Sequence, residues 1–331
     1  MRISNVIEAI DGIEMTQRVL ITGGGGFVGQ WLSRFLLSRG EKVYAGTLDG
    51  AAGPLLSRDE SEAICWMQLD VLSDDEIKRA LDTSAPDWVV HLAGIAYPPE
   101  ANASPVRAFE VNALGAARLL WALVPHASSG RLRVLVVGSA EQYGPHERAE
   151  YPLKETAAAH PLTAYAASKA AQELVALQIF RRTGLPVICT RSFNHSGPGH
   201  GHSYLLPSLV RRALELPKAG GLLRIGNSSP LRDFLHVDDV VDAYVRLLER
   251  GEPGEVYNVS SSHTMSVRDI ADRVLKHVGV SAEIAVDPSL VRPIDMPILV
   301  GDSTKLRLAT GWAPKRSIDD IIDDLIHAAT Y

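Results

Sequence analysis

The segment Arg18–Gly29, RVLITGGGGFVG, constrains the fold of this chain more than any other. Its apolar run Val19–Ile21 has the length of a buried parallel strand, and four glycines then lead into an apolar helix pattern. The spacing of Gly23, Gly26 and Gly29 allows a tight turn, a close approach to a diphosphate, and packing of the helix on its strand. A glycine-rich turn can also be only a flexible loop, but the flanking strand and helix are the context that a dinucleotide-binding turn requires.

The chain after this segment alternates between strand and helix patterns. Apolar runs predict strands at 42–47, 63–69, 88–91, 134–137 and 186–191, and helices at 27–39, 73–81, through 111–120, 164–180 and 237–250. The alternation implies right-handed crossovers and therefore an α/β, Rossmann-type, doubly wound parallel sheet with a smaller substrate-binding domain.

The chain has 331 residues, which is more than one domain of ordinary size contains, so we expect two parts. We expect an N-terminal extension at 1–15, in which Met15 is a possible natural start, and an NAD(P)-binding Rossmann domain at 16–191 plus about 234–259. The substrate-binding part is expected at about 192–233 and 260–331.

Composition limits the kinds of partner and the cellular compartment that we expect for this chain. The net charge of −6 argues against a nucleic-acid or membrane-surface partner, and no apolar run is long enough to cross a bilayer. The first fourteen residues lack the apolar block of a signal peptide. Cys65 and Cys189 both lie in strand-like runs, which predicts two buried thiols and a cytoplasmic protein rather than a disulfide scaffold.

The end of the second strand leaves the choice between NAD and NADP open. An acidic residue that closes this strand commonly binds the adenosine ribose and selects NAD. Here Thr47 and Leu48 occupy that place and Asp49 follows slightly late. The fourth strand ends in HLAG, where we interpret His91 as a hydrogen-bonded strand-end residue rather than a ligand.

Candidate catalytic residues follow the fifth strand, at the sheet edge where open parallel sheets bind ligands. Ser139 and Glu141 lie in GSAEQYG, and Tyr165 precedes Lys169 by four residues, so the phenol and ammonium share one helix face. Bringing a tyrosine pKa from about 10 to about 7 needs roughly 4 kcal/mol, which a nearby lysine and a cationic nicotinamide can supply. A lone YxxxK is usually a surface pair, but after a nucleotide-binding half it indicates a proton shuttle.

These motifs resemble the extended short-chain dehydrogenase/reductases, the NAD-dependent epimerase/dehydratase family. The resemblance covers about 18–328, through TGGGGFVG, LDV at 69–71, HLAG, GSAEQYG and YAASK. It implies that Ser139 polarises the sugar hydroxyl or ketone, that Tyr165 is the general acid/base, and that Lys169 holds the nicotinamide ribose and lowers the tyrosine pKa. Asn112 would keep its helix in working geometry near the lysine. Contacts with NADP or NAD are implied for Gly23, Gly26, Phe27, Val28, Gly29, Asp70, Val71, Leu92, Ala93, Gly94, Tyr165, Lys169 and Phe193.

The second half of the chain is similar to the GDP-4-keto-6-deoxy-D-mannose reductases within that family. The similar segments are RSFNHSGPGH at 191–200, GNSSPLRDFLHVDDVV at 226–241 and the segment 291–315. The resemblance implies that Asn194 lies near the sugar diphosphate, and that Arg232 and Arg292 clamp the diphosphate or its ribose, for which the planar guanidinium is suited. Ser192 and His200 depart from the subfamily pattern, which leaves the sugar identity open. No carboxylate or thiolate accompanies the nearby histidines, so no metal is expected.

Four functions remain open at this point. A reductase would deliver hydride to carbon 4 of a GDP-4-keto-6-deoxyhexose, the GDP-linked nucleotide sugar that we expect as substrate, while Tyr165 protonates the oxygen. A 4,6-dehydratase would use Glu141 as the carbon 5 base, although Ala140 cannot supply the extra acid of the dTDP-glucose enzymes. A 4-epimerase shares every catalytic residue. A redox-sensing NAD(P)-binding protein would have no reason to retain Ser139, Tyr165 and Lys169 together.

Two helices predict self-association. The segments 113–123 and 164–180 carry apolar residues beyond a single stripe, and a monomer would have to expose some of them. We therefore expect a homodimer that buries Leu114, Leu120, Trp121, Val175, Leu177 and Phe180.

Overall fold

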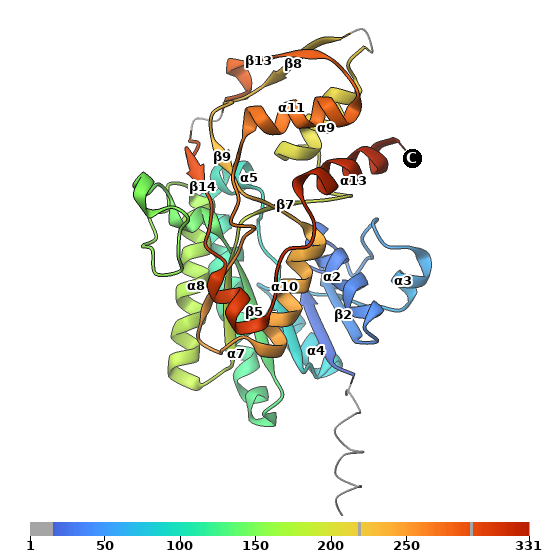
Figure 1. Ribbon diagram of the computed structural model, residues 1–331. Helices are drawn as coiled ribbons and strands as arrows, with labels where there is room; N and C mark the ends of the chain where they lie inside the picture. Colours follow the sequence, from blue (N-terminus) through green and yellow to red (C-terminus); the bar gives the residue numbers. More distant parts are fainter. Residues whose placement is uncertain (1–15, 218–219, 292–293, 331) are drawn as a thin grey trace, which may run out of the picture.

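A large parallel sheet forms the centre of the molecule (Figure 1), for which a computed structural model describes residues 16–217, 220–291 and 294–330. The strand order is β11-β6-β5-β4-β1-β2-β3, and all neighbouring strands are parallel. The strands are β1 (Arg18–Thr22), β2 (Lys42–Thr47), β3 (Cys65–Gln68), β4 (Trp88–His91), β5 (Arg133–Ser139), β6 (Val187–Ser192) and β11 (Val256–Val259). The predicted doubly wound α/β sheet is confirmed, whereas the expected extension at 1–15 lies outside the described residues.

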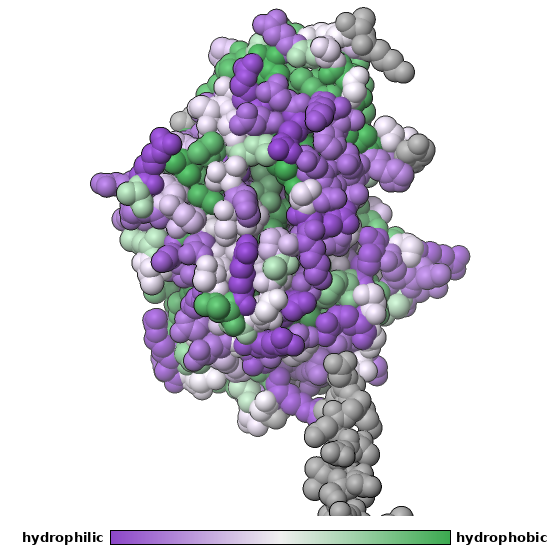
Figure 2. Space-filling model, in the orientation of Figure 1, coloured by the Kyte–Doolittle hydropathy of each residue, from purple (hydrophilic) through white to green (hydrophobic). Residues whose placement is uncertain are grey.

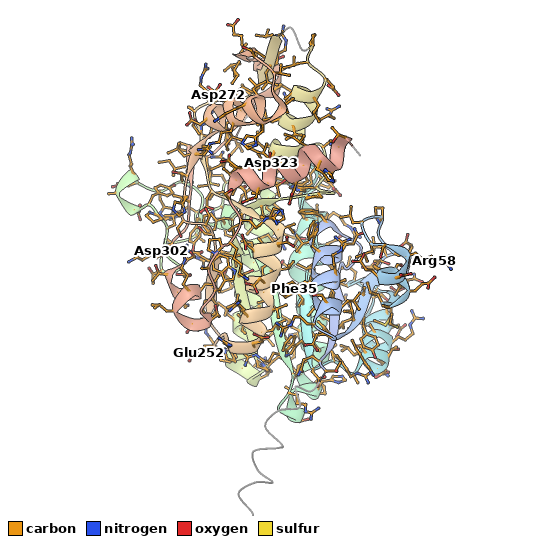
Figure 3. The ribbon with its side chains drawn as sticks, turned by 45° about the vertical axis from the view of Figure 1, so that its right-hand side comes forward. Phe35, Arg58, Glu252, Asp272, Asp302 and Asp323 are labelled. Atoms are coloured by element: carbon orange, nitrogen blue, oxygen red, sulfur yellow. The ribbon has the colours of Figure 1, made fainter. Side chains whose placement is uncertain are left out.

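Helices cover both faces of this sheet because successive residues of each strand point to opposite faces. Val19 and Ile21 of β1 pack with α2 (Phe27–Ser38) and α10 (Val237–Arg250), whereas Leu20 packs in a second cluster with α4 (Asp74–Ser84), α7 (Gly115–Leu123) and α8 (Ala164–Thr183). Figure 3 shows Phe35 on the α2 side of the interior and Arg58 projecting outward from α3 (Arg58–Glu62). The helix expected through 111–120 begins with a π-helical turn, η1 (Glu110–Leu114).

Short helical segments connect the main elements. They are α5 (Pro98–Ala103), α6 (Pro105–Phe109), η2 (Val124–Ser129), η3 (Ala140–Tyr143), η4 (Arg148–Glu150) and η5 (Pro288–Leu290).

Smaller sheets and a separate apolar cluster lie beyond the carboxyl ends of the large sheet, at the top of Figure 1. The sheets pair β7 (Asn194–Ser196) with β10 (Phe234–His236), β9 (Leu231–Arg232) with β12 (Met265–Ser266) and β14 (Ile298–Leu299), and β8 (Gly221–Ile225) with β13 (Ala282–Val286). The helices of this part are α9 (Leu205–Leu214), α11 (Val267–Val278) and α13 (Ile318–Thr330). Helix α12 (Thr304–Thr310) belongs with the large sheet, because Leu306 and Trp312 pack in the cluster that holds α2 and α10. The proposed domain boundaries stay a prediction.

Two sequence expectations about burial were wrong. Cys65 is exposed, because β3 is the edge strand of the large sheet, while Cys189 on an inner strand is buried. Leu120 is fully buried in the chain's own core and is not available to a partner. Leu114 and Trp121 are exposed, at 56% and 42%, and Leu174 on α8 is exposed at 65%.

The outer surface carries few extended apolar regions in the view of Figure 2, where hydrophilic residues cover most of the face and green patches are scattered. Within the described ranges, no helix combines the length and the apolar character that crossing a membrane requires.

Candidate active site

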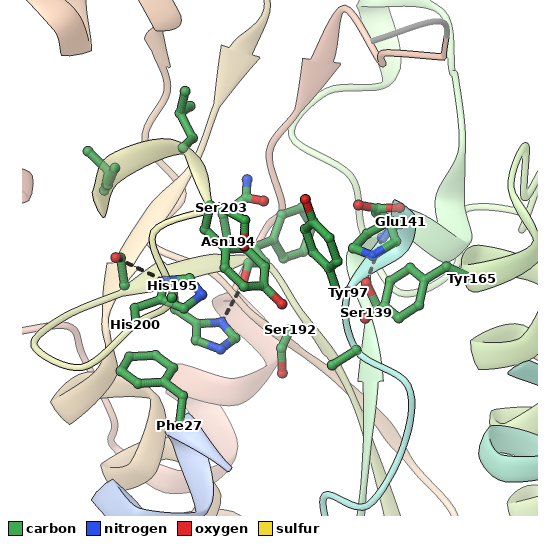
Figure 4. A pocket seen from close by; sticks show the side chains of 18 of the residues that line it. Phe27, Tyr97, Ser139, Glu141, Tyr165, Ser192, Asn194, His195, His200 and Ser203 are labelled. Carbon is green, nitrogen blue, oxygen red and sulfur yellow. Dashed lines mark hydrogen bonds between the residues drawn. The ribbon is translucent and has the colours of Figure 1, made fainter. Parts of the chain in front are cut away.

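A cavity of about 870 Å³ opens at the carboxyl ends of β1, β4 and β5. This size is typical of pockets that enclose small organic ligands. Its walls come from the β1–α2 turn, the ends of β4 and β5, the start of α8, and the segments around 192–206 and 226–234. Figure 4 shows Ser139, Glu141 and Tyr165 gathered on one side and Phe27, His195 and His200 on the other. The large sheet therefore presents its ligand-binding edge to residues from distant parts of the sequence.

The glycine turn forms a cradle that side chains would fill. A Cβ on Gly23, whose φ is +72°, would lie 2.8 Å from the Ala93 amide nitrogen, and a Cβ on Gly29 would lie 2.6 Å from the Gly23 carbonyl oxygen. Helix α2 starts after Gly26, and no described side chain caps its first turn. Its free amides and the positive end of the helix dipole suit a diphosphate. The residues present therefore fit a bound dinucleotide.

Most of the expected cofactor residues line this cavity. They are Gly23, Gly26, Phe27, Val28, Gly29, Leu92, Ala93, Gly94, Tyr165, Lys169 and Phe193. Asp70 and Val71 do not line it. The Asp70 carboxylate instead accepts a hydrogen bond from the Leu72 amide at 2.9 Å, and Val71 is 3% exposed. Their assignment to the adenine stays a prediction.

Asp49 lies on the surface just beyond β2. Its Oδ1 accepts hydrogen bonds from the Ala51 amide at 3.1 Å and the Thr47 hydroxyl at 3.2 Å. The Ala51 amide is the largest cause that lowers the pKa of this carboxyl, so Asp49 is ionised at neutral pH. A carboxylate therefore stands where the second strand ends, although slightly later than in the commonest arrangement.

Tyr165 lies in the first turn of α8, which begins where the Thr163 hydroxyl accepts the Ala166 amide at 3.1 Å. Tyr165 is 8% exposed, and its phenol lies close enough to the Ser139 hydroxyl for that group to affect its pKa. Burial raises the pKa of Tyr165, and the Glu141 carboxylate raises it further, whereas the Ser139 hydroxyl lowers it. The lowering expected from Lys169 together with a cationic nicotinamide stays a prediction. The phenol is protonated at neutral pH and can act as an acid.

Lys169 faces the sheet rather than the phenol. Its Nζ donates to the Val137 carbonyl and to Gln172 Oε1, both at 2.9 Å. Burial lowers the pKa of Lys169 to about 8. Lys169 is not among the main causes that shift the Tyr165 pKa. Its amine still lines the cavity beside Gly94, where a Cβ would lie 3.6 Å from Nζ.

Asn112 ties the π-helical turn to α8. Its Oδ1 accepts the Ile95 amide at 2.8 Å, and its Nδ2 donates to the Ile95 carbonyl at 3.2 Å and to Ser168 Oγ at 2.9 Å. Asn112 is fully buried and Ser168 immediately precedes Lys169. This arrangement supports the expectation that Asn112 positions the lysine-bearing helix.

The opposite wall holds the predicted substrate residues. Asn194 lines the cavity from β7, and its Nδ2 donates to the Asp233 carbonyl at 3.2 Å. Arg232 is held by the Met296 carbonyl at 2.7 Å and by an ion pair with Asp295. Arg292 lies outside the described residues, so its predicted role is not placed.

Aromatic rings cross one end of the cavity, and the sequence interpretation identified neither Tyr97 nor Tyr204 among them. The His200 ring stacks on Phe27, with centroids 4.5 Å apart, and on Tyr204, with centroids 4.0 Å apart. Tyr204 meets Tyr97 edge-on at 5.4 Å. Burial lowers the pKa of His200 to about 3, so this ring is neutral. Stacking between distant segments is visible only in three dimensions, although the departure at His200 from the subfamily pattern was a signal.

His91 is only partly satisfied. Its Nδ1 hydrogen-bonds the Thr22 hydroxyl at 2.8 Å, but its buried Nε2 has no partner among the described residues. Burial lowers its pKa to about 3, so the imidazole is neutral. In the part of the chain that the structure describes, no three His, Cys, Asp or Glu side chains are grouped to hold a metal ion.

Comparisons with known proteins agree with this geometry. The family model described as GDP-mannose 4,6 dehydratase matches residues 20–325. The GDP-6-deoxy-D-mannose reductase of Pseudomonas aeruginosa is 35% identical over 94% of this chain and 97% of its own. The structure of RMD from Pseudomonas aeruginosa complexed with NADPH has a TM-score of 0.79 at 33% identity, over 95% of this chain and 98% of that one. The UDP-glucose 4-epimerase of Thermus thermophilus, complexed with NAD, has a TM-score of 0.81 at 28% identity, over 94% of this chain and 99% of that one.

Proposed function

The chain belongs to the GDP-mannose 4,6-dehydratase family of NAD(P)-dependent nucleotide-sugar enzymes, and from this premise we propose that it reduces the carbon 4 ketone of a GDP-4-keto-6-deoxyhexose with NADPH or NADH. The observation that carries the proposal is the 35% identity to a GDP-6-deoxy-D-mannose reductase over 94% of the chain. The product would be of the GDP-D-rhamnose type. A protonated Tyr165 in the cavity supports the same direction, because ketone reduction needs a proton donor.

A reduced dinucleotide, its diphosphate held by the glycine cradle, would supply the hydride. The chain's own residues do the rest: Tyr165 donates a proton to the carbon 4 oxygen, and the Ser139 hydroxyl, which lies near that phenol, polarises the same oxygen. Lys169 holds the ribose of the cofactor. Because Tyr165 and Ser139 are each 8% exposed, little water competes for the reacting oxygen.

The substrate wall fits a sugar diphosphate. Arg232 brings a guanidinium, a group suited to phosphate, to the cavity. Its contacts with the Leu231 and Met296 carbonyls and with Asp295 fix the direction of the side chain. Asn194 offers a carboxamide beside it, held through the Asp233 carbonyl. These two residues would orient the nucleotide sugar so that its carbon 4 reaches Tyr165.

One observation favours a 4,6-dehydratase as a second candidate. Glu141 lines the cavity and lies close enough to Tyr165 for its charge to raise the phenol pKa. In a dehydratase this carboxylate would remove the carbon 5 proton, so Glu141→Gln would abolish turnover. In a reductase it only positions the sugar, and the same change should cost about tenfold in rate. A 4-epimerase would use the same residues as either.

A cofactor-consumption assay tests the proposal. The purified protein is mixed with NADPH or NADH and a panel of 4-keto-6-deoxy nucleotide sugars, and absorbance at the nicotinamide band is followed. A reductase oxidises the cofactor stoichiometrically, whereas a dehydratase or epimerase recycles it and shows no net oxidation. Conversion of GDP-mannose to its 4-keto-6-deoxy derivative without reductant, stopped by Glu141→Gln, would overturn the reductase assignment.

We further propose a cytoplasmic homodimer. Leu114 of η1, Trp121 of α7 and Leu174 of the neighbouring α8 are exposed, and a second copy could cover them as a four-helix contact. Both cysteines are free thiols, which suits a reducing compartment. A mass measurement that gives a monomer at micromolar concentration would contradict the dimer.

A further inference from the structure

Three buried side chains form a continuous polar chain beside Ser139. Gln142 Oε1 accepts the Ser139 amide at 3.0 Å, and Gln142 Nε2 donates to Glu173 Oε2 at 3.0 Å. The Glu173 carboxylate in turn accepts two hydrogen bonds from the Arg191 guanidinium, one from Nε at 2.9 Å and one from Nη2 at 2.7 Å. Gln142 is 1% exposed, and the Arg191 and Glu173 side chains are 9% and 11% exposed. None of the three lines the cavity.

The three residues come from three elements that carry the site. Gln142 lies in η3, the short helix that begins directly after Ser139. Arg191 lies on β6 and pairs with Gly138 of β5. Glu173 lies on α8 one turn beyond Lys169 and two turns beyond Tyr165, on the same face of the helix. The polar chain therefore fixes where α8 sits along the end of β5, and this sets the separation of the phenol and the serine.

Stability alone gives little reason for such an arrangement. Burying an ion pair costs desolvation, and apolar residues of similar volume are often as stable. Here the cost is met by full pairing: Arg191 Nη1 also donates to the Glu155 carbonyl at 3.2 Å, and the guanidinium lies 4.6 Å from the centre of the Tyr143 ring. A fully paired buried network specifies one arrangement of the elements that it joins.

We propose that Gln142, Glu173 and Arg191 form a positioning relay that holds the Ser139 hydroxyl against the Tyr165 phenol. The inference rests on the proposed function, because the spacing of Ser139 and Tyr165 matters only if these two residues act in the proposed reaction. The three are positioning residues and touch no reacting atom. The relay acts on the chemical step and leaves binding of the cofactor and of the sugar nearly unchanged.

A double-mutant cycle tests the relay. Gln142→Met keeps the side-chain volume but removes both hydrogen bonds, and it is measured in the natural chain and in a Ser139→Ala background. We expect kcat to fall about tenfold in the natural chain and less than about twofold in the Ser139→Ala background, with KM for the cofactor within about twofold in both. Equal losses of kcat in the two backgrounds, or an unchanged kcat in Gln142→Met alone, would overturn the relay.

Glu173→Gln gives a second measurement of the same idea. An amide cannot accept from Gln142 and from both Arg191 nitrogens, so we expect the same loss of kcat and the same dependence on Ser139. The matched control is Asp242→Asn, which breaks a bidentate ion pair with Arg246, Nε to Oδ2 at 2.9 Å, on α10 away from the cavity. Its kcat should stay within about twofold. Thermal unfolding and cofactor fluorescence report whether each variant is folded.

The outcomes separate the relay from the proposed function. If the unmutated chain oxidises no NADPH or NADH with any 4-keto sugar, the proposed function fails. The cycle is then read on the dehydration or epimerisation rate, since both reactions would use the same serine and tyrosine. If the unmutated chain is active but the cycle is additive, the relay alone fails.

Discussion

The two walls of the cavity are built by different physical means. The cofactor wall is built from backbone: Gly29 has no room for a Cβ, which would lie 2.6 Å from the Gly23 carbonyl oxygen. The substrate wall is built from side chains that other segments hold in place, such as Arg232 against the Met296 carbonyl at 2.7 Å. We therefore expect a substitution in the first wall to strain the fold, and one in the second to remove a contact with less effect on stability. Tyr165 lines the same cavity from the first turn of α8.

The largest expected effect is that of a substitution at Tyr165. Tyr165→Phe keeps the ring but removes the proton donor, so kcat should fall by about 10²–10⁴. Cofactor affinity, measured by fluorescence titration, and KM for the sugar should change little, because neither wall is altered. Near-normal turnover would show that another group is the acid, and a comparable loss of binding would assign the phenol to a wall instead.

A substitution in the substrate wall should weaken binding of the nucleotide sugar and leave the chemical step unchanged. Arg232→Met removes charge-assisted hydrogen bonds to the diphosphate, each worth about 1.5–3 kcal/mol, so KM for the nucleotide sugar should rise about ten- to a hundredfold. Steady-state kinetics should show kcat and KM for the cofactor within about twofold. Arg232→Lys keeps the charge without the fork and should give an intermediate KM. A change in thermal stability as large as that of a glycine-turn variant would break the distinction between the walls.

The cofactor wall should respond in both stability and binding. Gly29→Ala forces a methyl against backbone atoms, which typically costs about 1–3 kcal/mol of unfolding free energy, and cofactor affinity should weaken about tenfold. Gly26→Ala is the matched comparison, because its Cβ would meet only the Gly23 carbonyl at 3.2 Å. It should lose cofactor affinity with a smaller loss of stability, as chemical denaturation and titration can measure. Equal loss of stability in the two variants would contradict the cradle geometry.

The smallest expected effect is a dependence of cofactor affinity on pH through the protonation of Lys169. The Lys169 pKa of about 8 means that the amine is charged below this pH and neutral above it. If the ammonium holds the cofactor ribose, affinity for NADPH should fall a few-fold, about threefold to fivefold, between about pH 7 and pH 9.5. The His91 imidazole that faces it has a pKa of about 3 and stays neutral in this range. Lys169→Met should abolish the pH dependence, and a parallel slope in that variant would assign it to another group.

Sequence patterns predicted the frame of this molecule well because they depend on local rules. Strands β2 and β4 and helix α10 have the bounds that apolar runs and periodicity indicated. The turn glycines were recognisable because only a residue without a Cβ fits there.

What the sequence could not predict depends on distant contacts. The exposure of Cys65 follows from the edge position of β3, which a strand pattern does not encode. Leu120 of α7 is buried in the chain's own core, and a π-helical turn at Glu110–Leu114, which a simple helical period does not predict, precedes its helix. Gln142, Glu173 and Arg191 lie far apart in the chain, and no local pattern marks them as partners.

The raised pKa of Tyr165 also bears on how the phenol would regain its proton between turnovers. If Tyr165 protonates the sugar oxygen as proposed, the resulting phenolate is disfavoured by burial and by the Glu141 carboxylate, and both favour its reprotonation. Tyr165 is 8% exposed and lines the cavity together with Ser139 and Glu141, so the proton would reach the phenol from the cavity. The sugar would occupy that same space, so its departure would open the path by which solvent restores the acid.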